Sequence, residues 1–162
     1  MAPSEPNGCR PRGVPDRRGF TLIELLGVVI VLGILLALAI PRYKTVVRQA
    51  KIARAIGDIR ALRNDILSYE GTNQSLPPDL ATIGRAGLKD PWGNDYVYFK
   101  FPPGPGVPGA ARKDRFLVPV NSEFDLYSKG QDGASVPPFS GPGLDDIVMA
   151  ADGGFIGLAS KF

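Results

Sequence analysis

The chain has 162 residues, a formal net charge of +3, one cysteine and no histidine, a length that fits one modest domain and a membrane segment. The missing histidine removes the commonest general base and the commonest neutral metal ligand, which argues against an enzyme. A single cysteine forms no intrachain disulfide, and the Lys and Arg residues gather on no aromatic-rich face, so nucleic-acid binding is not expected.

Residues 1–19 are rich in proline and arginine, a composition that predicts a disordered leader. Arg17 and Arg18 stand directly before an apolar segment. By the positive-inside rule this pair stays in the cytoplasm and the rest of the chain crosses the membrane. Cys9 lies in the leader and is not preceded by the apolar core of a lipoprotein signal.

The apolar segment, residues 20–40, is polar only at Thr21 and Glu24. As a helix it would be roughly 30 Å long, about the thickness of a hydrocarbon core. A secretory signal places its apolar core before the cleavage site, whereas here the small residue Gly19 precedes that core. A carboxylate costs roughly 2.5–3.5 kcal/mol at mid-bilayer, so Glu24 either has a partner or sits in water at headgroup level.

Residues 17–43, with G-F-T-L-I-E before the apolar span and Pro41 after it, resemble the class III signal of type IV pilins and type II secretion pseudopilins. The resemblance implies that a prepilin peptidase cleaves after Gly19 and that the new amine on Phe20 is methylated. It also implies that Glu24 meets the N-terminal amine of a neighbouring subunit, and that the helix continues past Pro41. A plain signal anchor is the alternative.

Beyond Pro41 the apolar residues follow a spacing of three or four, which predicts an amphipathic helix. Gly71 and the pair Pro77-Pro78 provide its stop signals. The predicted long helix therefore covers residues 20–71. Its second half must bury an apolar stripe against the remaining chain.

Residues 72–162 are expected to form a globular head that begins with a loop. One helical turn is predicted near 79–83. Aromatic and β-branched runs predict strands, and these lie at 96–101, 115–120, 123–127, 147–150 and 155–158. Asn121-Ser122 is a candidate hairpin turn. The expected fold class is α+β, with the second half of the long helix packed on a small antiparallel sheet.

The sequence D-P-W-G-N-D-Y at residues 90–96 contains two turn signals, Asp-Pro and Gly-Asn. Trp92, the only tryptophan, is expected to fill the seam between helix and sheet. This stretch resembles the major pseudopilins of type II secretion systems more than it resembles pilins of type IV pili.

Several carboxylates stand in the glycine-rich segment that follows Tyr127. Calcium takes six to eight oxygens from such loops, although the spacing alone fits solvated turn residues better. The order D-L-Y-S-x-G-x-D-G and then D-D-I resembles the calcium loop of the major pseudopilins. That resemblance implies side-chain ligands from Asp132, Asp145 and Asp146 and a backbone carbonyl from Lys129. The chain departs from the pattern in two ways: the loop is longer and contains prolines, and Lys129 stands where the pattern usually has a leucine.

The resemblance implies a structural subunit, anchored in the inner membrane with a periplasmic head, that polymerises with copies of itself. Its other implied partners are the prepilin peptidase, the inner-membrane assembly platform and minor pseudopilins. The filament would belong to a type II secretion system. The alternative is an extracellular type IV pilus used for adhesion, motility or DNA uptake, although many such pilins carry a disulfide loop that this chain lacks.

Overall fold

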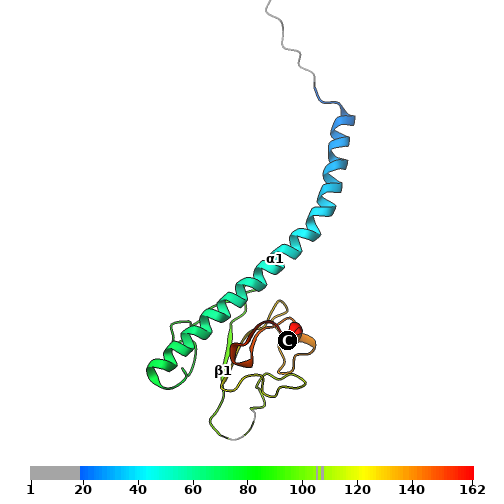
Figure 1. Cartoon of the computed structure of the whole chain (residues 1–162). Coiled ribbons are helices and arrows are strands. Elements are labelled where there is room, and N and C mark those ends of the chain that lie inside the picture. The colour runs from blue at the N-terminus through cyan, green and yellow to red at the C-terminus, as the bar shows by residue number, and fades with distance from the viewer. Residues whose placement is uncertain (1–18, 105, 107) are drawn as a thin grey trace, which may run out of the picture. The chain divides into compact units, whose positions relative to one another are not determined.

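The computed structural model describes residues 19–162 apart from 105 and 107. The predicted leader, residues 1–19, lies outside the described residues except for Gly19. The chain divides into two units, Met1–Arg42 and Tyr43–Phe162. The first holds the apolar half of the helix α1, and the second holds the rest of α1 and the sheet (Figure 1).

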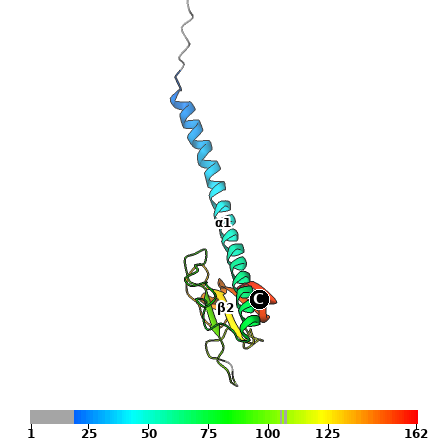
Figure 2. The ribbon, with the colours of Figure 1, turned by 90° about the vertical axis from the view of Figure 1, so that its left-hand side faces the viewer.

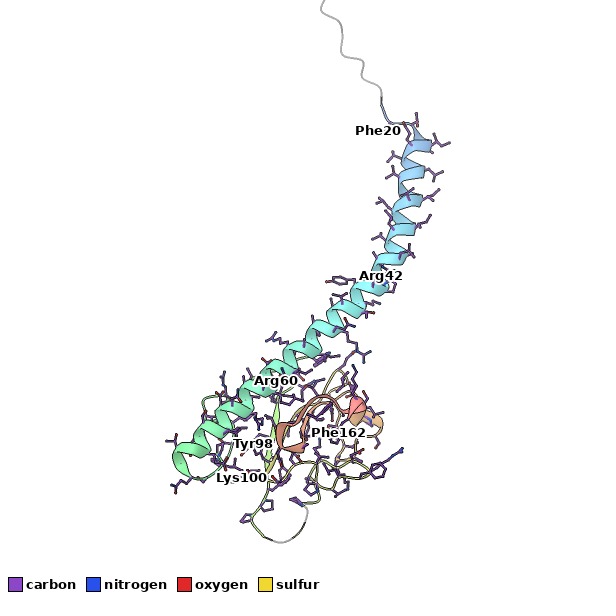
Figure 3. The ribbon with its side chains drawn as sticks, in the orientation of Figure 1. Phe20, Arg42, Arg60, Tyr98, Lys100 and Phe162 are labelled. Carbon is purple, nitrogen blue, oxygen red and sulfur yellow. The ribbon has the colours of Figure 1, made fainter. Side chains whose placement is uncertain are left out.

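Helix α1 runs from Leu22 to Asn73 without interruption, within two residues of the predicted span at each end. Pro41 lies inside it, so the helix continues past the proline as the resemblance implied. Among the described residues, α1 is the one helix long and apolar enough to cross a membrane. Its apolar side chains project on all sides between Phe20 and Arg42 (Figure 3), and the large ones among them are exposed.

Four short strands form one antiparallel sheet in the order β1-β2-β3-β4. Their bounds are Val97–Lys100, Phe124–Ser128, Ile147–Ala150 and Phe155–Leu158. Short 3-10 helices η1, η2 and η3 span Gly141–Leu144, Ala151–Gly153 and Ala159–Lys161. Each strand therefore pairs with the next one along the chain. Lys100 lies opposite Phe124, Ser128 opposite Ile147 and Ala150 opposite Phe155.

The sheet packs against the second half of α1, as two views at right angles show (Figures 1 and 2). The helix contributes the predicted apolar stripe, buried at Ala55, Ile59, Leu62 and Ile66. The facing residues of the head are Tyr96, Phe124, Leu126, Ile147 and Met149. Trp92 is partly buried against this cluster. The α+β fold predicted from the sequence is confirmed.

Polar contacts tie the chain after α1 to the first strand. The Tyr98 hydroxyl donates to the Pro77 carbonyl at 2.9 Å, and the Lys100 ammonium donates to the Leu76 carbonyl at 2.8 Å. Figure 3 labels both side chains on β1. Burial raises the pKa of Tyr98 to about 12, with the charges of Glu70 and Glu123 adding to the effect. The turn predicted near 79–83 is present as hydrogen-bonded turns, with the amide of Thr82 bound to the Asp79 carboxylate.

The prediction of a strand at 115–120 was wrong, and so was the prediction of a hairpin turn at Asn121-Ser122. The segment is irregular, and Phe116 is 92% exposed. Leu117 and Val118 are also exposed, so apart from the buried Val120 the large apolar residues face no packed layer. Pro119 has no amide hydrogen to give to a sheet. Asn121 is buried instead, and its side-chain amide donates to the Asp125 carboxylate and to the Met149 carbonyl.

Candidate processing and cation-binding sites

The predicted cleavage site is accessible. Gly19 and Phe20 are both exposed and both precede the first residue of α1. A Cβ atom built on Gly19 would have no other heavy atom within 4 Å. The described fold therefore has room for a side chain at this position.

Glu24 closes a capping box at the start of α1. Its Oε2 accepts the Thr21 amide at 2.8 Å and the Thr21 hydroxyl at 2.7 Å, while the Glu24 amide donates to that hydroxyl at 3.3 Å. Such a box satisfies backbone donors that have no partner within the helix. Sequence reasoning missed this role, although Thr-x-x-Glu is its local signature. The carboxylate is also exposed, so it remains accessible to a second chain.

Two of the four predicted metal ligands lie together. Asp145 Oδ2 accepts the amides of Gln131 and Asp132 at 2.8 and 3.2 Å. The Asp132 carboxylate turns to its own loop and accepts the Ala134 amide at 2.8 Å. Asp132 and Asp145 also line a pocket of about 210 Å³ together with Arg48, a cation.

Lys129 lies next to Gly130, whose backbone packs closely against that of Asp145. That glycine has a φ of +67°, and a Cβ on it would lie 2.4 Å from the Asp145 backbone oxygen. Only glycine permits so close an approach of the two backbone segments. The Lys129 side chain is half-buried.

Asp146 faces the other way. Its carboxylate is fully buried, and Oδ2 accepts the Ser135 hydroxyl at 2.5 Å and the guanidinium of Arg112. Burial raises the pKa of the Asp146 carboxyl, while the Ser135 hydroxyl and the Arg112 charge oppose that rise. Asp145 and Asp146 are adjacent in sequence, yet one binds loop amides and the other binds a buried cation.

A calcium ion requires several oxygens that converge on one point. No group of three Asp, Glu, His or Cys side chains among the described residues is arranged to hold a metal. As placed, Asp132, Asp145 and Asp146 do not fit the ligand set that the resemblance implied. Metal binding itself is untested by this geometry, so the calcium site stays a prediction.

Arg112 is the residue that sequence reasoning missed. It stands in a loop without periodicity, and its partners lie more than twenty positions further along the chain, so no local signal marks it. Its side chain is only 2% exposed.

The 90–96 motif is structural. Asp90 is buried, and its Oδ1 accepts the amides of Trp92 and Asn94 at 3.0 and 2.8 Å. Its Oδ2 accepts the Ser128 hydroxyl at 2.6 Å, which ties this turn to the end of β2. Asn94 then donates to the Gly130 carbonyl at 3.0 Å. The turn therefore supports the start of the acidic loop.

Comparison with known protein families gives a match to the prokaryotic N-terminal methylation motif over residues 15–40. Type II secretion system core protein G of Escherichia coli K12 is 33% identical over 75% of this chain and 87% of its own length. The protein of the same name from Pseudomonas aeruginosa is 37% identical over 73% of this chain and 86% of its own length.

A fimbrial protein of Pseudomonas aeruginosa is 45% identical, over 29% of this chain and 30% of its own length. No solved structure matches the chain. The matches to the two type II secretion system core proteins G extend well beyond the N-terminal motif into the head. On that identity and coverage, the chain belongs to the family of type II secretion system core protein G.

Proposed function

We propose that the chain is a structural subunit of a type II secretion pseudopilus. It is made as a precursor whose basic leader stays in the cytoplasm while the head crosses to the periplasm. A prepilin peptidase cuts between Gly19 and Phe20 and methylates the new amine. The mature chain then leaves the inner membrane as part of a filament, and it acts as a subunit rather than as an enzyme.

One observation carries this proposal. The two type II secretion system core proteins G match 73% and 75% of this chain at 37% and 33% identity. Matches of that length must include part of the sheet-bearing head. The fimbrial protein matches only 47 residues. A short match fits any member of the wider group, whereas a match that extends into the head favours the secretion subunit.

The chemistry of α1 supports polymerisation. Large apolar side chains from Phe20 to Ile40 are all at least half exposed in the single chain. In the membrane they contact lipid tails, which are as apolar as the side chains of a second helix. Exchange of lipid for protein contacts is then nearly neutral for these residues, so polar groups decide the register of assembly.

Glu24 is the polar group that fits this role. Its carboxylate is the only charge between Phe20 and Ile40, at the end where cleavage creates an amine on Phe20. A carboxylate and an amine in apolar surroundings each reduce the desolvation cost of the other. The incoming subunit's amine is therefore the partner that we assign to Glu24. The growing filament has two further proposed partners, the inner-membrane assembly platform and the minor pseudopilins.

A type IV pilus subunit is the second candidate, and the 45% identity to a fimbrial protein over 47 residues favours it. Deletion of the gene in its source organism separates the two. We expect loss of secreted proteins from the medium, restored by the wild-type chain and not by Glu24→Val. Intact secretion with loss of surface pili or of pilus-dependent motility would favour the pilus and contradict the proposal.

A further inference from the structure

The head contains a buried cation of its own. The Arg112 guanidinium, on a loop between β1 and β2, lies against the acidic segment that precedes β3. Its position is fixed at the backbone, because the Arg112 amide donates to Asp125 at 2.6 Å and its carbonyl accepts the Val120 amide at 2.9 Å. The side chain is therefore held in place before it makes any contact with the loop.

The guanidinium binds three kinds of oxygen from the loop. Its Nη1 donates to the Val136 carbonyl, and its Nη2 donates to the Ser135 hydroxyl at 2.7 Å and to the Asp146 carboxylate. Its central carbon also lies 3.8 Å from the centre of the Tyr127 ring, a cation–π contact. Carbonyl, hydroxyl and carboxylate oxygens are also the ligands that a hard metal cation prefers.

The remaining oxygens suit a divalent cation poorly. Asp146 Oδ1 has no hydrogen-bond partner in the described part of the chain, but it is buried beside the guanidinium. The positive charge of the guanidinium repels a metal ion at that oxygen. Asp145 Oδ2 already accepts two backbone amides, which satisfy its charge.

We propose that Arg112 replaces a metal ion as the cation that holds segment 129–146 in place, so the head folds without calcium. One positively charged side chain links the loop before β2 to the loop before β3, which is the connection a shared metal would otherwise make. This inference concerns the head alone and stands whether or not the filament belongs to a secretion system.

The test is thermal unfolding of the mature full-length chain in detergent, followed by the fluorescence of Trp92, with millimolar calcium or with chelator. We expect the two Tm values to agree within about 1 °C, because no folded-state site takes up the ion. A real site at a hundredfold excess over Kd would raise Tm by roughly 10 °C in a domain of this size. Such a shift in the wild-type chain would overturn the proposal.

Variants at the pair make the test independent of calcium. Arg112→Met should lower Tm by many degrees because it leaves the buried Asp146 carboxylate without its partner. Arg115→Met, at an exposed arginine of the same loop, is the matched control and should leave Tm unchanged. Arg112→Met combined with Asp146→Leu should recover part of the loss, since neither buried charge then remains.

The double variant also keeps the proposal falsifiable if Arg112→Met alone does not fold. A folded double variant supports the pairing. Additive losses in the Arg112→Met and Asp146→Leu cycle would show that the two side chains do not act together, and would contradict the proposal.

Discussion

The apolar half of α1 and the head differ in how their apolar side chains are buried. Between Phe20 and Ile40 the large side chains have no partner within the described chain and lie exposed around the helix. In the second unit, Tyr43–Phe162, Leu62 of α1 and Leu126 of β2 are almost fully buried, and the cation Arg112 has a buried counter-charge in Asp146. The apolar half depends on lipid or on other subunits, whereas the head buries its apolar face against the second half of α1. The variants below should therefore separate assembly from folding.

The largest effect is expected at the cleavage site. Gly19→Val should abolish processing and leave the precursor in the membrane, because the peptidase must accommodate the residue before the cut. The head should still fold, since a Cβ atom at position 19 would have no other heavy atom within 4 Å. Immunoblotting of membranes resolves precursor from mature chain, with Gly57→Ala, another glycine whose Cβ would meet nothing, as the control. Normal amounts of mature chain from Gly19→Val would move the cleavage site elsewhere.

The next effect concerns assembly without folding. Glu24→Val removes a charge from the apolar span, so membrane insertion should be unchanged or improved. Filament growth should fail, because the amine of the next subunit loses its partner. Electron microscopy of sheared filaments measures this outcome.

Thr21→Val separates the two roles of Glu24. It removes the hydroxyl of the capping box and keeps the carboxylate. We expect filaments from Thr21→Val and none from Glu24→Val. Equal failure of both variants would show that Glu24 acts only within its own helix.

A smaller and purely structural effect is expected in the core. Leu62→Ala should lower the free energy of unfolding of the head by about 2–5 kcal/mol, since it removes buried methyl groups and leaves a cavity. Leu36→Ala, in the exposed apolar half, should leave that free energy within about 0.5 kcal/mol of wild type. Denaturant unfolding of the mature chain in detergent, followed by Trp92 fluorescence, compares them. A large loss from Leu36→Ala would mean that the two regions do not fold independently.

The smallest effect is a pH dependence. The pKa of Tyr98 is about 12 in the folded head, against about 10 in an unfolded chain. An acid with a raised pKa binds its proton more tightly when folded, so stability falls as pH rises from about 10 to 12. Tyr98→Phe should make that fall less steep, at the cost of the hydrogen bond to Pro77. An unchanged slope in unfolding measured between these pH values would place the titration at another group.

Local sequence predicted the parts of this molecule that depend on local contacts. The apolar run, the spacing of Ile59, Leu62 and Ile66, and the β-branched segments gave the helix and all four strands. Segment 115–120 failed because apolar composition does not show whether a packed layer faces it, and Phe116 is exposed. Thr21 and Glu24 carried a capping signature that was overlooked.

The candidate cation site was less accessible to sequence. The acids near Asp145 marked the loop, but the choice of partner for Asp146 depends on Arg112, 34 residues earlier in the chain. No periodicity or motif joins two such positions. The pairing follows from the fold, which brings the loops before β2 and β3 together.

The central claim is that the apolar half of α1 becomes buried between subunits while the head is unchanged. Cys9 is the single cysteine, so the mature chain that we propose, which starts at Phe20, has none. Leu36→Cys and Phe116→Cys therefore each provide one thiol, in the apolar half and on the exposed head loop. The measurement is the rate of thiol labelling in sheared filaments and in detergent-dispersed chains. We predict that assembly protects Leu36→Cys at least tenfold more than Phe116→Cys. Equal rates at Leu36→Cys in both samples would contradict the account.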